Sequence, residues 1–279
     1  MTTTLETPTT ARTVTAAGIA TTVHVLGDPA TQPVVVLVHG SGPGVTAHAN
    51  WRLTMPALAE RFCVVAPDVV GFGSTERPEG FEYSMPAWTA HLVGVLDALG
   101  IERADVVGNS FGGGLAASLA VHHPERLRRL VLMGATVAPQ RITPGLDAVW
   151  GYEPSVENMQ ALLELFAFDR AALGPDLARL RYEASIATGV QEAYSSMFPA
   201  PRQRALDAIT QPVAAVATIG HPTLVVHGYD DRVIPVESSI ALLGMLPDAR
   251  LHVFGRCGHW TQIEHADAFN RLVLDFLSS

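Results

Sequence analysis

The chain has 279 residues, of which 48% are hydrophobic and 16% are charged, and its formal net charge is −9. This composition is typical of a globular protein with a large core and excludes a disordered chain. The acidic balance, without a basic stripe, argues against a nucleic-acid partner. The longest aliphatic run, Val34–Val38, is far shorter than the roughly 20 residues that cross a bilayer, so we expect no membrane span.

The N-terminal segment, MTTTLETPTTARTV, is rich in threonine and lacks the basic and apolar regions of a secretory signal. We therefore expect a cytoplasmic protein. Lone thiols usually stay reduced in that compartment, so Cys63 and Cys257 are predicted to be structural residues.

Short apolar runs that are typical of buried strands recur along the chain, and helical patterns fill most of the gaps between them. Within 86–99, for example, apolar residues from Trp88 to Leu99 fall on one helical face. This alternation predicts an α/β fold, with a mostly parallel sheet flanked by helices and functional loops at the carboxyl ends of the strands. The predicted strands are residues 33–39, 62–67, 104–108, 129–134, 223–227 and 249–254.

The alternation is interrupted between about residues 139 and 209. Helical patterns such as 155–168 and 175–186 occur there without a strand between them. Since this segment follows one predicted strand and precedes another, we expect it to lie over the carboxyl edge of the sheet. We predict an α/β core formed by residues 1–138 and 209–279, with a helical lid at residues 139–208.

Ser110 lies in the sequence GNSFG, which matches the pattern G-x-S-x-G. It follows the predicted strand 104–108 and precedes a helical run, which is the context that a nucleophile elbow requires. Gly108 and Gly112 would keep side chains from colliding across this strained turn. The positive end of the next helix would face the serine. A glycine-rich turn without chemistry is the alternative.

A catalytic serine needs a base. Among the eleven histidines, His259 lies in the glycine-bracketed CGHW loop after the predicted strand 249–254, at the same sheet edge as Ser110. Other histidines lie in helical, strand or loop contexts that suggest no catalytic partner: His24, His91, His122, His123, His221, His252 and His265.

The base in turn needs an acid that orients it, and two carboxylates in HGYDDRVIP follow the strand 223–227. The spacing to Pro235 favours Asp231, and Asp230 is then a solvated neighbour. The chain order Ser, Asp, His is the order associated with the hydrolase elbow.

The sequence HGSGPG, residues 39–44, follows the first predicted strand. It lacks the Gly-Lys-Ser/Thr ending of a phosphate loop and the spacing of a dinucleotide fingerprint. A turn with few side chains lets a backbone N–H face a developing oxyanion. The N–H groups of Ser41 and Phe111 are therefore predicted to form an oxyanion hole, and a plain turn is the alternative.

From about residue 33 onward the chain resembles the α/β-hydrolase superfamily, and within it the meta-cleavage product hydrolases, which cut carbon–carbon bonds in aromatic degradation. The lid motifs are most similar to those of 2-hydroxymuconic semialdehyde hydrolases and their alkyl-ketone relatives, whereas a generic esterase would match the elbow alone. The motifs that carry the resemblance are HGSGPG, NW at Asn50 and Trp51, APDVVGFGSTERP, GNSFGGG, GLDAVWGY, FAFDR, RYEASI, MFPAPRQR and LHVFGRCGHWTQIEH.

The resemblance implies the same triad and the same oxyanion donors. It also implies that Asn50, Asn109, Arg181 and Trp260 line the polar end of a substrate pocket. Arg181 would bind the carboxylate of the dienoate, which the planar guanidinium suits. On composition alone Arg181 would be an ordinary charge on a helix surface.

The activity that the resemblance implies is hydrolysis of the C5–C6 bond of 2-hydroxy-6-oxohexa-2,4-dienoates, such as 2-hydroxymuconic semialdehyde. The partner is a small-molecule dienoate, with no metal or organic cofactor, no nucleic acid and no membrane, and the chain is expected to form dimers or larger homo-oligomers. The lid motifs favour small C6 substituents, whose contacts are expected to include Leu206 and Ile234.

Other functions stay open at this stage. A carboxylesterase-type acyl hydrolase would use the same triad, and a meta-cleavage product hydrolase specific for 6-aryl substrates would share most of the motifs. A ligand-binding protein without activity could also have this fold. Dehalogenases and epoxide hydrolases require a carboxylate where this chain has Ser110, so the serine excludes them.

Overall fold

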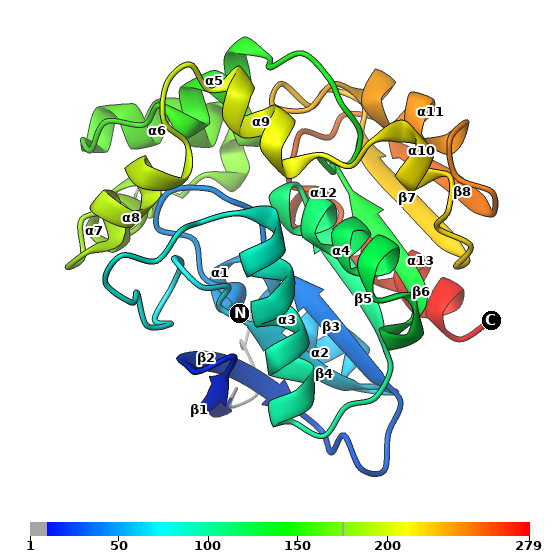
Figure 1. The fold of residues 1–279 in the computed structure, drawn as a ribbon. Coiled ribbons are helices and arrows are strands. Elements are labelled where there is room, and N and C mark those ends of the chain that lie inside the picture. Colours follow the sequence, from blue (N-terminus) through cyan, green and yellow to red (C-terminus); the bar gives the residue numbers. More distant parts are fainter. Residues whose placement is uncertain (1–9, 175) are drawn as a thin grey trace, which may run out of the picture.

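The computed structural model describes residues 10–174 and 176–279. One sheet holds eight strands in the order β1-β2-β4-β3-β5-β6-β7-β8. Neighbours from β4 to β8 along this order pair in parallel, whereas β1–β2 and β2–β4 pair antiparallel, which confirms the expected α/β-hydrolase fold with its mostly parallel sheet (Figure 1). The strands are β1 (Thr10–Ala16), β2 (Ile19–Leu26), β3 (Val34–Val38), β4 (Cys63–Pro67), β5 (Ala104–Asn109), β6 (Leu127–Met133), β7 (Thr223–Gly228) and β8 (Ala249–Phe254).

Helices occupy the connections between the parallel strands. The helix expected at 86–99 is α3, and the patterns at 155–168 and 175–186 contain α6 and α7. None of the helices in the described ranges is long and apolar enough to cross a membrane. The helices are α1 (Ala47–Trp51), α2 (Met55–Leu58), α3 (Met85–Ala98), α4 (Phe111–His122), η1 (Pro124–Arg126), α5 (Pro144–Trp150), α6 (Val156–Phe166), η2 (Arg170–Ala172), α7 (Leu177–Ser185), α8 (Val190–Met197), α9 (Gln203–Ile209), α10 (Val213–Val216), α11 (Val236–Leu243), α12 (Thr261–Glu264) and α13 (Ala266–Leu277).

Two hydrophobic cores lie on opposite faces of the sheet. In β3, Val36 and Val38 belong to one core and Val35 and Leu37 to the other, because successive residues of a strand point to opposite faces. Both faces are covered, α3 and α4 lying over one and α1, α2 and α13 over the other. A strand that is buried on both faces needs apolar side chains at every position, which explains the unbroken apolar runs in the sequence.

The antiparallel strands β1 and β2 were missing from the sequence-based prediction. They form a hairpin whose turn residues, Ala17 and Gly18, have φ values of 49° and 82°, as in the tight turns that suit the twist of paired strands. Both strands contain several threonines and lack the apolar runs by which the other strands were predicted. Threonine is β-branched and favours extended backbone at a half-buried sheet edge.

The carboxyl ends of the parallel strands gather at one edge of the sheet. Helices α5 to α9, all within residues 139–209, lie above this edge between β6 and β7 (Figure 1). This stretch contains no strand among the residues that the structure describes. We refer to residues 139–208 as the insertion.

Both cysteines are buried and unpaired, as expected of reduced structural residues. Burial raises the pKa of Cys63 to about 11, so its thiol is protonated at neutral pH. Cys257 is likewise held in the thiol form, because burial and then the nearby Glu264 carboxylate raise its pKa.

Candidate active site

Ser110 sits on a sharp turn between β5 and α4. Its backbone has φ 55° and ψ −118°, a strained conformation for a residue with a side chain. A Cβ atom on Gly108 would lie 2.4 Å from the carbonyl oxygen of Gly112, and one on Gly112 would lie 2.4 Å from that of His39. Only glycine fits at either position, so the turn has the tight packing that the GNSFG sequence predicts.

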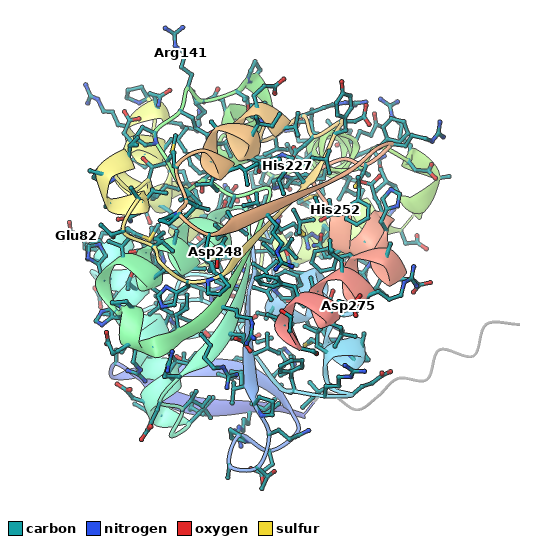
Figure 2. The ribbon with its side chains drawn as sticks, turned by 90° about the vertical axis from the view of Figure 1, so that its right-hand side faces the viewer. Glu82, Arg141, His227, Asp248, His252 and Asp275 are labelled. Atoms are coloured by element: carbon teal, nitrogen blue, oxygen red, sulfur yellow. The ribbon has the colours of Figure 1, made fainter. Side chains whose placement is uncertain are left out.

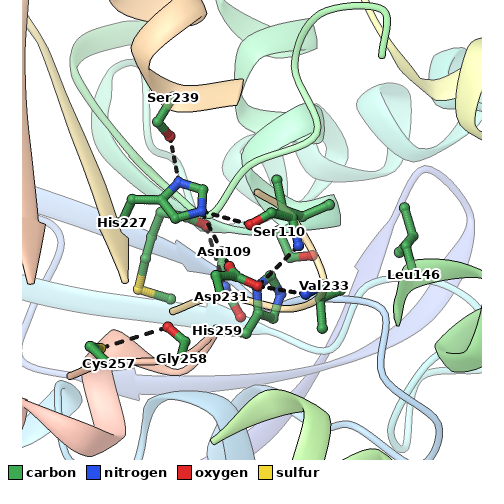
Figure 3. Close-up of polar contacts among 12 residues, drawn as sticks. Asn109, Ser110, Leu146, His227, Asp231, Val233, Ser239, Cys257, Gly258 and His259 are labelled. Atoms are coloured by element: carbon green, nitrogen blue, oxygen red, sulfur yellow. Dashed lines mark hydrogen bonds and ion pairs between the residues drawn. The ribbon is translucent and has the colours of Figure 1, made fainter. Parts of the chain in front are cut away.

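Asp231 and His259 are in contact at the ends of β7 and β8. The Oδ2 atom of Asp231 lies 2.6 Å from Nδ1 of His259. Its Oδ1 atom accepts hydrogen bonds from the backbone N–H groups of Val233 at 2.8 Å and Ile234 at 2.9 Å. Of the two adjacent carboxylates in the sequence, Asp231 and not Asp230 has this contact. Figure 3 shows the arrangement.

The environment of Asp231 favours its ionised form. Burial would raise the pKa of Asp231, but the imidazoles of His259 and His227 hold that pKa well below its usual range. Since an ionised carboxylate only accepts hydrogen bonds, the proton of a neutral His259 lies on Nδ1. Its Nε2 atom is then able to accept a proton, and both His259 and Ser110 line one cavity.

The loop that follows β3 lies against the turn that carries Ser110. Gly40, Ser41 and Gly42 line the same cavity, and a Cβ atom on Gly40 would lie 3.4 Å from Cβ of Ser110. Phe111 begins α4, and its ring is fully buried. The structure therefore brings together the segments of both predicted oxyanion donors next to the serine.

Two residues that the sequence analysis left without a role hold this loop. His39 accepts a hydrogen bond at Nε2 from the N–H of Val69 at 3.0 Å, so its Nδ1 carries the proton and donates to the carbonyl oxygen of Gly40 at 2.7 Å. Trp150, at the end of α5, donates from Nε1 to Oγ of Ser41 at 3.0 Å. The loop is thus tied both to the core and to the insertion.

The four residues that the family resemblance places at the polar end of a pocket all line this cavity: Asn50, Asn109, Arg181 and Trp260. Burial, followed by the like charge of Arg52, lowers the pKa of Arg181 to about 10, so the guanidinium stays charged at neutral pH.

Three buried polar atoms of cavity-lining residues have no hydrogen-bond partner within the described chain. They are Nδ2 of Asn50, Nε of Arg181 and Oε1 of Gln262. Buried polar groups in folded proteins nearly always have partners, so these atoms are available to bind a polar group in the cavity. A ligand that satisfied all three would carry both acceptors and a donor.

Another part of the cavity wall is apolar and is formed by Leu146, Val149 and Val233. Leu206 and Ile234, which we expected near the C6 substituent, are buried but are not among the lining residues of the described chain. Within residues 10–174 and 176–279, no three His, Cys, Asp or Glu side chains are grouped as metal ligands.

Hydrogen bonds join the insertion to the loop that carries His259. The N–H of His259 donates to the carbonyl oxygen of Phe166 at 2.7 Å. The Glu264 carboxylate accepts from Gly258 N–H at 2.7 Å through one oxygen, and from Phe168 N–H at 2.7 Å and Asp169 N–H at 3.0 Å through the other. Glu264 was not singled out from the sequence, because two of its three partners, Phe168 and Asp169, lie about a hundred residues away.

Comparison with known proteins agrees with this geometry. A family model described as alpha/beta hydrolase fold matches residues 33–266. The chain belongs to the α/β-hydrolase family.

Named relatives of this α/β hydrolase are similar over nearly its whole length. It is 56% identical over 268 residues to 2-hydroxy-6-oxo-2,4-heptadienoate hydrolase of Pseudomonas putida strain F1, covering 96% of each chain. It is 55% identical over 267 residues to 2-hydroxymuconate semialdehyde hydrolase of Pseudomonas sp. strain CF600, covering 96% of this chain and 93% of that one.

A solved structure of a meta-cleavage product hydrolase is also similar to this chain. The meta-cleavage product hydrolase of Pseudomonas fluorescens IP01, in a serine-to-alanine variant complexed with acetates, is 54% identical to the chain. The TM-score is 0.93, and the match covers 96% of this chain and 97% of that one. The resemblance to meta-cleavage product hydrolases that the motifs indicated is confirmed.

Proposed function

We propose that this α/β hydrolase cleaves the C5–C6 bond of 2-hydroxy-6-oxohexa-2,4-dienoates that carry hydrogen or a small alkyl group at C6. One observation carries the proposal. The cavity that Ser110 and His259 line is also lined by a charged Arg181 and by Asn50. Nε of Arg181 and Nδ2 of Asn50 have no hydrogen-bond partner within the described chain. The names of the two relatives at 55% and 56% identity describe substrates of this class.

Arg181 is proposed to bind the carboxylate of the substrate. Among the described residues the Arg181 guanidinium forms no ion pair, although Glu264 also lines the cavity. A charged guanidinium there favours an anion, and its planar fork matches a carboxylate with two parallel hydrogen bonds. Asn50, Asn109 and Trp260 would complete this polar end. The net charge of −9 makes such a local cation necessary for a negatively charged substrate.

We propose that the first chemical step is a proton transfer. A carbanion released directly from C5 would be too unstable to leave. Moving the proton of the 2-hydroxyl group to C5 gives a 2,6-dioxo chain, in which the electrons of the C5–C6 bond can flow to the 2-oxo group. His259, with Asp231 on its Nδ1 side, is the residue proposed to assist this transfer.

Cleavage would then follow the course of serine hydrolases. Ser110 adds to the C6 carbonyl while His259 takes its proton, and the N–H groups of Ser41 and Phe111 stabilise the oxyanion. Breaking the C5–C6 bond releases 2-hydroxypenta-2,4-dienoate, and one water molecule hydrolyses the acyl-enzyme to a small carboxylic acid. No step needs a metal or an organic cofactor.

We propose that the insertion, residues 139–208, acts as a lid on a core formed by residues 1–138 and 209–279. It contributes Leu146, Val149 and Arg181 to the cavity wall, whereas Ser110 lies on the turn that follows β5. A cytoplasmic homo-oligomer is part of the same proposal. Light scattering of the purified protein and fractionation of the host cell test those two properties.

An acyl hydrolase with the same three residues is the second candidate, because the proposed triad would also hydrolyse esters. The charged Arg181 in the cavity favours the dienoate. The test measures loss of the visible absorbance of three dienoates with hydrogen, methyl or phenyl at C6. We expect the first two to be turned over faster than the third, and Ser110→Ala to turn over none of them. A wild-type chain that hydrolysed esters but no dienoate would contradict the proposal.

A further inference from the structure

His227, the next-to-last residue of β7, is fully buried and touches the proposed acid of the triad. Its Nε2 atom lies 3.3 Å from Oδ2 of Asp231, the same oxygen that contacts His259. His227 is thus unlike Arg141, which projects from the surface in Figure 2. Figure 3 shows Asp231 between the two imidazoles. The sequence analysis gave His227 no role.

The surroundings of His227 determine which nitrogen carries the proton. Nε2 faces the carbonyl oxygen of Ile234 at 2.9 Å as well as the Asp231 carboxylate, and both groups only accept hydrogen bonds. Nε2 is therefore the protonated nitrogen. Nδ1 lies 2.6 Å from Oγ of Ser239 on α11, and it accepts a hydrogen bond from that hydroxyl. A neutral imidazole satisfies every partner in this arrangement.

We propose that His227 is a positioning residue that holds the Asp231 carboxylate in the orientation in which it faces His259. This inference rests on the triad of the proposed function. Oδ1 of Asp231 is fixed by two backbone N–H groups. Oδ2 lies 3.3 Å from Nε2 of His227 on one side and 2.6 Å from Nδ1 of His259 on the other.

His227 also fixes the backbone that carries Asp231. The carbonyl oxygen of Ile234 belongs to the turn that follows Asp231, and its contact with Nε2 ties this turn to β7. Ser239 in turn ties the imidazole to α11. The acid is thus held through its side chain and its main chain by one residue that does not line the cavity of the described chain.

This placement predicts an effect on kcat and not on KM. Loss of the Nε2 N–H would remove its contact with Oδ2 and its hydrogen bond to Ile234, so the carboxylate could turn away from His259. We expect KM to change little, because His227 is not among the residues that line the cavity of the described chain. A hydrogen bond to a charged group is strong enough for a loss of about tenfold to a hundredfold in kcat.

Two polar substitutions separate the contact with Asp231 from the contact with Ser239. His227→Gln keeps an N–H group near the Nε2 position, and His227→Asn keeps a polar group near the Nδ1 position but cannot reach Asp231. We expect kcat to fall about tenfold or more in His227→Asn and to stay within about fivefold of wild type in His227→Gln, with KM within about threefold in both. Equal losses in both variants, or an increase in KM alone, would overturn the proposal.

His91→Gln is the matched control, since His91 is also a buried imidazole that bonds a hydroxyl group but lies on α3, away from the cavity. We expect its kcat to stay within about threefold of wild type. Thermal melting of each variant reports whether it folds.

A double-mutant cycle tests whether His227 acts through Asp231. In an Asp231→Ala background, His227→Asn should cost less than about threefold in kcat, because residues that act as a unit are not additive. The same fractional loss in both backgrounds would overturn the proposal. The ratios are measured on whichever of a dienoate or p-nitrophenyl acetate the wild type hydrolyses, so failure to turn over dienoates contradicts the proposed function alone.

Discussion

The backbone N–H of His259 donates to the carbonyl oxygen of Phe166 at 2.7 Å, which joins the proposed base to the last residue of α6. The rings of the same two residues stack at 5.9 Å, and the ring of Phe166 also stacks on that of Trp260 at 4.9 Å. Glu264 strengthens this junction with hydrogen bonds on both sides. The position of the insertion and that of His259 are therefore mechanically linked.

The first prediction concerns Glu264. Its carboxylate accepts three backbone N–H groups, whereas the amide of Glu264→Gln presents its own N–H atoms toward one side. We expect the variant to lose about 2 kcal/mol of unfolding free energy and about tenfold in kcat on the preferred dienoate. Urea unfolding and steady-state kinetics measure the two effects. Glu183→Gln on the exposed face of α7 is the control, and wild-type behaviour of both variants would contradict the linkage.

The second prediction concerns Gly134, which follows β6. Its φ is 51°, and a Cβ atom there would lie 3.2 Å from Nδ1 of His259 and 3.3 Å from Oδ2 of Asp231. We expect Gly134→Ala to push these groups apart and to lower kcat by about tenfold or more, while backbone strain costs about 1 kcal/mol. Gly100→Ala separates the two effects, because Gly100 has a φ of 67° and open space around it. Equal activity in both variants would show that the space at Gly134 is not needed.

The third prediction tests the proposed anion site. Arg181→Gln removes the cation, so we expect kcat/KM on the dienoate to fall about a hundredfold, mostly through KM, and hydrolysis of p-nitrophenyl acetate to change less than about threefold. Arg181→Lys should recover only part of the loss, since an ammonium cannot form two parallel hydrogen bonds. Arg179→Gln, at an exposed position on the same helix, serves as the control. A parallel decline on the ester would argue for a structural role.

The fourth prediction concerns substrate size. Leu146 forms part of the apolar wall together with Val149 and Val233. Leu146→Ala should enlarge this part of the cavity and raise the ratio of 6-phenyl to 6-methyl turnover about tenfold, at a cost of about 3 kcal/mol in stability. Leu206→Ala should lose comparable stability without altering the ratio, because Leu206 is buried but does not line the cavity of the described chain. A change of the 6-phenyl to 6-methyl ratio in Leu206→Ala would contradict the assignment of Leu146 and not Leu206 to the cavity wall.

The fifth prediction concerns stability in acid. Burial, followed by the nearby His39, lowers the pKa of His91 to about 4, whereas an unfolded chain protonates histidine near 6.5. As the pH falls from 6.5 to 4, the unfolded state binds the proton first, so His91 removes up to about 3 kcal/mol of stability over this range. His91→Gln should show a smaller decline in unfolding free energy over the same range. Parallel curves of unfolding free energy against pH for the wild type and His91→Gln would contradict the role of His91.

Much of the fold follows from local signals. The strands β3 to β7 are mostly buried and appear in the sequence as apolar runs, whereas β8 lies at the sheet edge and is largely exposed. Most of the predicted ends of β3 to β8 lie within one or two residues of the observed ones. The hairpin of β1 and β2 lacks this signal, because it lies at the sheet edge and uses threonine. Its stability comes from pairing with β4, which a local pattern does not reveal.

Local sequence signals predict some residues of the candidate site but not others. Ser110 is marked by the two glycines that its turn requires, and His259 and Asp231 are marked by their places after strands. Glu264 and His227 carry no such mark. Each is an ordinary polar residue until the chain folds, and each acquires its partners from loops or helices that the fold brings near.

Neither of the two residues that we expected in the apolar wall, Leu206 and Ile234, lines the cavity of the described chain. We expected Ile234 in the cavity, but its neighbour Val233 lines it. The backbone N–H groups of both residues bind Asp231, so the turn that holds the acid decides which side chain faces the substrate. This choice depends on turn geometry and could not be made from residue type.

The bond between Phe166 and His259 sets a condition for chimaeras of this family. A graft that replaced residues 139–208 with helices from a homologue would retain the whole sheet, yet it would also replace the carbonyl group that receives the His259 N–H. Anyone transplanting a new specificity in this way would have to preserve the main-chain path from Phe166 to Asp169, or start the donor segment beyond it.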